Sequence, residues 1–106
     1  MHAFDVLGDP VRRRILELLA GGEHSSGVMV AVVQAEFGIT QSAVSQHLKV
    51  LREARLLTSA PAGNRHIYQV DPAGVAALRD YLDGFWNRSL AAFKRAAEDG
   101  QEEQER

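Results

Sequence analysis

Residues 38–57 read GITQSAVSQHLKVLREARLL, and this stretch decides the fold because it predicts a tight turn followed by an amphipathic helix. Gly38 suits the turn, and Thr40 is a favourable N-cap for a helix of about fourteen residues. At about 100° per residue, the core-facing positions gather on one side of this helix. They are Ala43, Val44, His47, Leu48, Val50 and Leu51.

The opposite side of this helix carries no carboxylate before Glu53, which is unusual for a surface helix. Its members are Gln41, Ser42, Ser45, Gln46, Lys49 and Arg52. Glutamine can pair with an adenine edge, serine can bond base edges or phosphate, and lysine and arginine neutralise phosphate. Such a face is typical of a helix that enters a DNA major groove. The alternative is an ordinary core helix whose polar side lacks acids by chance.

Length and composition limit the class of protein. A chain of 106 residues that is 45% hydrophobic predicts one globular domain over residues 1–100, followed by a polar tail over residues 101–106. No apolar run approaches the roughly 20 residues of a membrane span, and no signal peptide is visible. We therefore expect a cytoplasmic protein with no membrane partner. The absence of cysteine excludes disulfides and thiolate metal sites.

The charge is distributed unevenly along the chain. The formal net charge is −2 at pH 7, which by itself argues against a nucleic-acid partner. Between residues 40 and 70, however, four cations face a single acid, whereas eight acids outnumber five cations from Asp71 onward. The basic part contains the candidate reading helix, so the acidic total does not exclude DNA.

The N-terminal part predicts a short apolar segment followed by a helix. A short apolar segment ends at Gly8, and Asp9-Pro10 then begins a helix that Gly21-Gly22 closes. The first turn of this helix carries the basic triplet of residues 12–14. A solvated face is the ordinary explanation for such a triplet, with phosphate contact or a salt bridge as the alternatives.

The run VMVAVVQAEF over residues 28–37 fits two structures. Its β-branched composition alone would predict a buried strand. We expect a helix, because serines that can cap it precede the run and Gly38 follows it. Met29, Val33 and Phe37 would then face the core, and Gln34 and Glu36 would face solvent. Helix, glycine-containing turn and helix together form a helix-turn-helix.

Two short strands, over residues 56–60 and 65–70, are predicted after the candidate reading helix, joined by a turn over residues 61–64. A hairpin in this place is a wing, and its tip carries Asn64, Arg65 and His66. These side chains are placed to reach phosphates or an adjacent minor groove. The fold class is therefore mostly α with a small β-hairpin wing, a winged helix-turn-helix.

Asp71-Pro72 begins the last and longest predicted helix, which we expect to end near Asp99 before a frayed tail. Its apolar stripe would be about 40 Å long, too long to bury against a domain of this size. We therefore expect a symmetric homodimer that uses this stripe, joined by the N-terminal segment. The expected interface residues are Phe4, Leu7, Leu78, Leu82, Phe85, Trp86 and Phe93.

Three pieces of the chain carry a resemblance to a known family: FDVLGDPVRRRILELLAGG, AEFGITQSAVSQHLKVLREA and GNRHIYQVDP. In order and spacing they resemble the ArsR family of bacterial winged helix-turn-helix repressors over nearly the whole chain. The resemblance implies a homodimer built by the first and last helices. It also implies an inverted-repeat DNA operator bound through Gln41, Ser42, Ser45, Gln46 and the wing residue Arg65.

The chain departs from the family at two positions of the candidate reading helix. The family commonly has glycine where Arg55 stands. Either a left-handed arginine there costs on the order of 1 kcal/mol, or the helix ends differently. The family also often has proline where Ser42 stands, and the serine adds a hydroxyl that can form hydrogen bonds.

The sensing chemistry of the family's metal-responsive members is not matched. Those members use cysteines, or aspartate and histidine on the last helix, whereas this chain has no cysteine and no histidine after His66. We expect no metal and no cofactor, as in a metal-free branch of the family whose last helix is similarly aromatic. An unidentified small-molecule inducer stays open as a partner.

Two other classes of function are the alternatives to a DNA-binding regulator. A winged-helix module for protein or RNA contact would not need Gln46 and Arg65 on a common face. An enzyme would need a nucleophile, a glycine-rich phosphate loop or a convergent acid–base pair, none of which is visible in the sequence.

Overall fold

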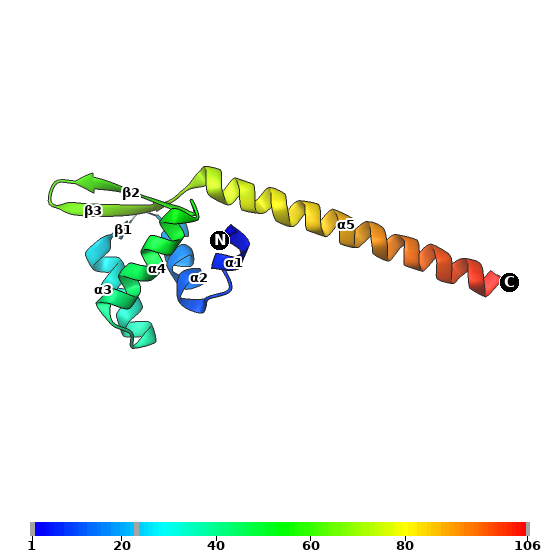
Figure 1. The fold of residues 1–106 in the computed structure, drawn as a ribbon, viewed down its shortest axis with the longest axis horizontal. Coiled ribbons are helices and arrows are strands. Elements are labelled where there is room, and N and C mark those ends of the chain that lie inside the picture. The colour runs from blue at the N-terminus through cyan, green and yellow to red at the C-terminus, as the bar shows by residue number, and fades with distance from the viewer. Residues whose placement is uncertain (1, 23, 106) are drawn as a thin grey trace. The chain divides into compact units, whose positions relative to one another are not determined.

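The computed structural model describes residues 2–22 and 24–105, with side chains described up to residue 100 (Figure 1). The elements in chain order are α1 (Ala3–Val6), α2 (Pro10–Ala20), β1 (His24–Ser25), α3 (Ser26–Phe37), α4 (Gln41–Glu53), β2 (Leu57–Ala62), β3 (Arg65–Val70) and α5 (Pro72–Glu105). The chain divides into two compact units, one over residues 1–76 and one over residues 77–106.

α3 and α4 form the predicted helix-turn-helix. Residues 28–33 are helical, as the capping serine indicated: the Ser25 hydroxyl accepts from the Val28 N–H at 3.4 Å. Gly38, at φ 63°, ends α3, and the Thr40 hydroxyl caps α4 by accepting from the Ala43 N–H at 3.1 Å. The two helices are bent by 114° at this turn, within the range of helix-turn-helix pairs.

The core of the first unit is apolar and joins α1, α2, α3, α4 and the start of β2. Its buried side chains are Val6, Val11, Ile15, Leu19, Met29, Val33, Val44, Leu48, Leu51, Leu56 and Leu57. No single helix in the described residues is long and apolar enough to cross a membrane; α3 and α4 reach that length and hydropathy only as a bent pair.

Three predictions about the core were wrong in detail. Phe37 was expected to face the core but remains 37% exposed, because α3 ends at this residue and the chain turns away at Gly38. Gln34 was expected in solvent but is half-buried, since its amide Nε2 donates to the Ile39 carbonyl at 3.3 Å across the turn. His47 is half-buried rather than part of the core, because it lies at the margin of the inward face of α4.

The wing is larger than the sequence predicted. β1, β3 and β2 form one antiparallel sheet in that order, and β1 adds the pairs His24–Tyr68 and Ser25–Ile67. β2 begins at Leu57 and runs on to Ala62, so the connecting turn has only two residues. Gly63 opens this turn at φ 64°, as a type II′ turn requires.

Pro61 therefore lies inside β2, opposite His66, and not in the turn where it was predicted. In a two-residue hairpin the pair beside the turn, Ala62–Arg65, exchanges the ladder hydrogen bonds, and the next pair does not. Because Pro61 belongs to that second pair, its missing N–H removes no bond to β3.

The end of α4 is closed by a left-handed residue, which decides between the two conformations that the sequence left open at Arg55. Arg55 has φ 60°; its N–H donates to the Arg52 carbonyl and the Leu56 N–H donates to the Leu51 carbonyl, each at 3.0 Å. These two bonds form a Schellman motif. Leu51 and Leu56 are both fully buried, which supplies the hydrophobic contact that accompanies the motif.

The start of α5 is bonded directly to this helix end. The Asp71 N–H donates to the Leu56 carbonyl at 3.0 Å, and the Asp71 carboxylate caps α5 by accepting from the Ala73 N–H at 3.0 Å. Gly74 packs so closely that a Cβ at this position would overlap the carbonyl of Arg55. A glycine is therefore required in the first turn of α5.

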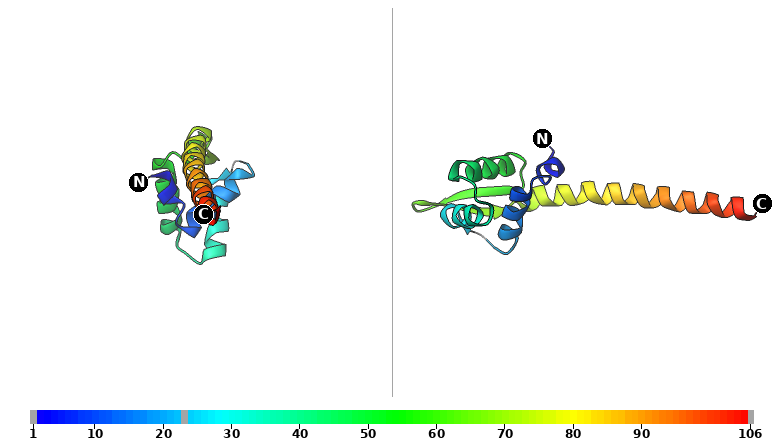
Figure 2. Two further views of the ribbon diagram at one scale, coloured as in Figure 1. Left: turned by 90° about the vertical axis from the view of Figure 1, so that its right-hand side faces the viewer. Right: turned by 90° about the horizontal axis from the view of Figure 1, so that it is seen from below.

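The second unit consists of the remainder of α5, which is an unbroken helix (Figure 2). The helix was predicted to end near Asp99, but it continues to Glu105, because glutamine and glutamate sustain helices well. Arg106, the last residue of the predicted tail, lies outside the described residues. Large apolar side chains of this unit are exposed in the single chain; they are Tyr81, Leu82, Phe85, Trp86, Leu90 and Phe93.

Candidate nucleic-acid interface

The polar face of α4 is fully presented to solvent. Every residue predicted for it is exposed: Thr40, Gln41, Ser42, Ser45, Gln46, Lys49 and Arg52. The first acid of the helix is Glu53, in its last position. Hydrogen-bonding groups that suit base edges therefore lie toward the start and middle of the face, and cations lie toward its end.

The buried side of α4 fixes which residues face outward. Val44 and Leu51 are 0% exposed and Leu48 is 4% exposed, so three successive turns of the helix are anchored in the core. Rotating the helix would expose these side chains at a cost of about 1.5–3 kcal/mol each. The polar face is consequently a rigid surface, which suits recognition of a partner whose groups have fixed spacing.

The tip of the wing is also exposed, at Asn64, Arg65 and His66. Together with residues 25–28, at the start of α3, these three residues line a shallow hollow. The unpaired backbone N–H groups of a helix N-terminus and nearby cationic side chains both favour an anion such as phosphate. The predicted wing residues are thus brought beside the start of α3.

Sequence reasoning identified Ser25 and Ser26 only as a helix start and did not place them beside the wing. The short strand β1 places them there, because its pairing with β3 joins residues that are 42 and 44 positions apart in the sequence. A two-residue strand gives no periodicity to detect in a sequence. Only the tertiary structure brings this segment to the wing.

The basic triplet of α2 is used within the fold, in agreement with the salt-bridge alternative. Arg14 holds Glu36 of α3 by two hydrogen bonds of 2.8 and 2.9 Å, which raise the pKa of Arg14 and lower that of Glu36. Arg13 donates to the Leu7 carbonyl at 2.9 Å, and Arg12 lies 3.9 Å from the Asp9 carboxylate. The triplet therefore ties the first three helices together.

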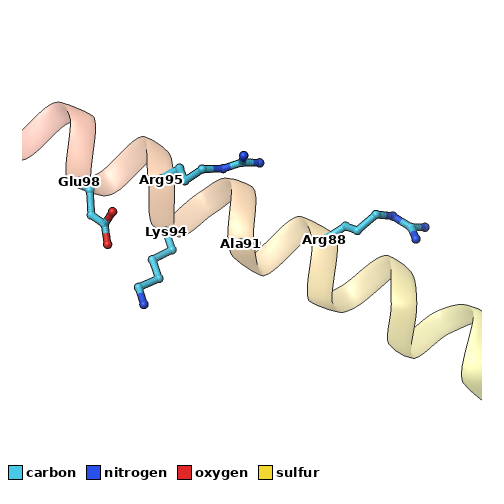
Figure 3. Close-up of a pocket in the computed structure, with 5 residues that line it drawn as sticks. All are labelled: Arg88, Ala91, Lys94, Arg95 and Glu98. Atoms are coloured by element: carbon cyan, nitrogen blue, oxygen red, sulfur yellow. The ribbon is translucent and has the colours of Figure 1, made fainter.

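In the part of the chain that the structure describes, no three histidine, cysteine, aspartate or glutamate side chains form a cluster that could hold a metal ion. Figure 3 shows another hollow, lined by Arg88, Ala91, Lys94, Arg95 and Glu98. All five residues belong to α5, and Arg88 and Arg95 point to one side while Lys94 and Glu98 point to another. A hollow lined by one helix cannot enclose a small molecule.

The residues expected at a dimer interface are largely uncovered in the single chain. Phe85, Trp86 and Phe93 are 58%, 64% and 72% exposed, and Phe4 and Leu82 are 48% and 41% exposed. Leu7 and Leu78 are half-buried. Aromatic side chains exposed to this degree along one helix are typical of a surface that another chain covers.

Comparisons with known proteins agree with this geometry. Residues 7–60 match the family described as a helix-turn-helix domain. The chain is 46% identical to the HTH-type transcriptional regulator Rv2034 of Mycobacterium tuberculosis, over 87% of this chain and 82% of that protein. It is 33% identical to the arsenical resistance operon repressor of Staphylococcus xylosus, over 74% and 71% of the two chains.

Solved structures give the same result. The crystal structure of a possible transcriptional regulator for arsenical resistance matches with a TM-score of 0.65 and 41% identity, over 82% of this chain and 91% of that one. An ArsR family transcriptional regulator matches with the same TM-score at 19% identity, over 79% and 82% of the chains. At 19% identity, this second match shows that the two proteins share a fold.

Proposed function

The chain belongs to the ArsR family of winged helix-turn-helix transcriptional regulators, and on that premise we propose that it is a repressor that binds an inverted-repeat DNA operator as a homodimer. The observation that carries the proposal is the outward face of α4, which has no acid before Glu53 and is held in place by three buried side chains.

Each part of the face has a distinct role in the proposal. Gln41, Ser42, Ser45 and Gln46 reach base edges in the major groove, where amides and hydroxyls can distinguish base pairs. Thr40, Lys49 and Arg52 hold the sugar–phosphate backbone and set the register of the helix. Asn64, Arg65 and His66 of the wing hold the flanking backbone or the adjacent minor groove.

The homodimer supplies the symmetry of the operator. A two-fold axis that buries the exposed stripe of α5, together with Phe4 and Leu7, would present two copies of α4 to the same side of DNA. Two such helices enter successive major grooves about 34 Å apart, so the operator is an inverted repeat. Phe85, Trp86 and Phe93 of α5 are the anchors of this interface.

The proposal places the protein in the cytoplasm, where the chromosome lies, and assigns it no catalytic step, metal or membrane partner. An inducing small molecule stays unassigned, because neither described hollow encloses a ligand. The proposal assigns the chain to the metal-free branch of the family, which it resembles in its aromatic last helix, and the chain has no cysteine and no histidine after His66.

The test is a fluorescence-anisotropy titration with two duplexes, one from the protein's own promoter and one with the same bases in scrambled order. Sequence-specific DNA-binding proteins have an affinity for their sites that is about 10³-fold or more higher than their affinity for random DNA. We expect at least that ratio of affinities between the two duplexes near physiological salt. A single-stranded RNA of the same sequence is the control. Equal affinity for the two duplexes, or tighter binding to the RNA, would reject operator reading.

A further inference from the structure

Arg55, just beyond the end of α4, is held in a conformation that its side chain disfavours. Among the described residues it is the one non-glycine with a positive φ, at 60°. A Cβ makes the left-handed region unfavourable, which is why glycine usually occupies this position of a helix end.

The fold imposes this conformation whatever the side chain. The Arg55 and Leu56 N–H groups close the Schellman motif, and Leu56 is fully buried, so neither residue can unwind without exposing apolar surface. Gly74 packs against the Arg55 carbonyl from the other direction. Glycine at position 55 would satisfy all these contacts, so the arginine side chain contributes nothing that the backbone requires.

The side chain of Arg55 is exposed and follows two other exposed cations in the sequence. It follows Lys49 and Arg52 at intervals of three residues, and all three are exposed. In the part of the chain that the structure describes, the Arg55 guanidinium forms no salt bridge, in contrast to that of Arg14. An exposed cation held in a disfavoured conformation, without an ion-pair partner among the described residues, is available to an anionic partner.

We infer that Arg55 contacts a phosphate of the DNA backbone at the C-terminal end of α4, in addition to Lys49 and Arg52. The inference rests on the proposed function. Because the backbone of Arg55 is fixed by the Schellman motif and by Gly74, only side-chain freedom is lost when the guanidinium binds. The simpler explanation is that Arg55 stabilises the fold by lying near the negative end of the α4 dipole.

Substitution with glycine separates the two explanations, because they predict opposite effects on folding. Arg55→Gly removes the unfavourable left-handed side chain, although glycine also makes the unfolded chain more disordered. We therefore expect a Tm equal to that of the wild type or a few degrees higher. If the arginine stabilised the helix end, the Tm would fall.

DNA binding by the same variant should weaken. Removing one phosphate contact from each protomer makes the slope of log affinity against log salt shallower by about 2, from 0.9 per phosphate. Operator and scrambled DNA should lose affinity by the same factor, because phosphate contacts carry no sequence information. Arg55→Lys keeps the charge and the conformational cost, so it should keep the wild-type slope.

Arg88→Gln is the matched control, since it removes one exposed positive charge from α5 and should leave the slope unchanged. An Arg55→Gly variant with the wild-type slope overturns the inference, and so does a lowered Tm that accompanies weaker binding. Wild-type protein that fails to prefer operator DNA overturns the proposed function itself. If the wild-type protein prefers operator DNA but Arg55→Gly keeps the wild-type slope of log affinity against log salt, only the role of Arg55 is rejected.

Discussion

Gln46 and Lys49 should affect DNA binding in different ways, although they lie one turn apart on the same helix face. Both side chains are exposed, and neither contributes to the buried side of α4. Alanine at either position therefore leaves no cavity, and helix propensity changes little or improves. Differences in DNA binding between the two variants can then be attributed to contacts with DNA.

The size of each effect follows from the charges on the face. Lys49, Arg52 and Arg65 give six cations in a dimer, and six phosphate contacts give a slope of log affinity against log salt of about −5. Including Arg55 would bring it to about −7. Lys49→Ala should weaken binding to every sequence alike and make the slope shallower by about 2.

Gln46→Ala should instead cost about 1–3 kcal/mol on the operator for each good base pairing, which is roughly 5- to 150-fold, with little change on random DNA. Arg65→Ala should fall between the two, because a wing arginine reads groove width as well as charge. The assay is anisotropy on operator and scrambled duplexes at several salt concentrations. If Gln46→Ala lowers both affinities by the same factor, α4 does not read bases in the way proposed.

Three further outcomes are expected. Trp86→Ala should convert a dimer into monomer or aggregate in light scattering, because truncating a buried tryptophan costs about 3–5 kcal/mol, whereas the adjacent Asn87→Ala should not; a monomeric mass for the wild type would refute the interface. Purified, chelator-treated protein should contain no stoichiometric zinc by elemental analysis, and added zinc should leave DNA affinity unchanged; one tightly held zinc per protomer would contradict this. Gly74→Ala should destabilise the fold by about 3 kcal/mol in urea unfolding, because its Cβ would overlap the Arg55 carbonyl, while Gly84→Ala, whose Cβ has ordinary contacts, should stabilise by about 0.5–1 kcal/mol; equal effects would show that the two sites are equivalent.

Features set by neighbouring residues were predictable from the sequence. The caps at Asp9 and Thr40, the turn at Gly38 and the helical state of residues 28–33 depend on hydrogen bonds within a few positions. The reading face was predictable for the same reason, since all its residues lie on one helix and share its period. The conformation of Arg55 was left open by the sequence, because helices commonly end with glycine at this position and an arginine disfavours the left-handed region.

Features set by distant residues were not predictable. Pairing of β1 with β3 gives a two-residue strand no sequence signal of its own, so the contact between the start of α3 and the wing was missed. The requirement for glycine at position 74 depends on a carbonyl 19 residues earlier in the chain. Phe37 and His47 were placed too deep because periodicity gives the direction of a side chain but not the depth of its surroundings.

Pro61 has a consequence for the behaviour of the protein at high concentration. β2 is an edge strand, and edge strands offer free N–H groups on which a strand of another molecule can add. At position 61 the backbone nitrogen points away from β3, where another residue would present a free N–H group. Proline has no backbone N–H and therefore presents no donor there. An incoming strand would therefore meet a gap in the ladder and the bulk of the pyrrolidine ring close to the tip. Pairing of a second molecule along the free edge of β2 is thus interrupted at Pro61, next to the exposed residues of the tip.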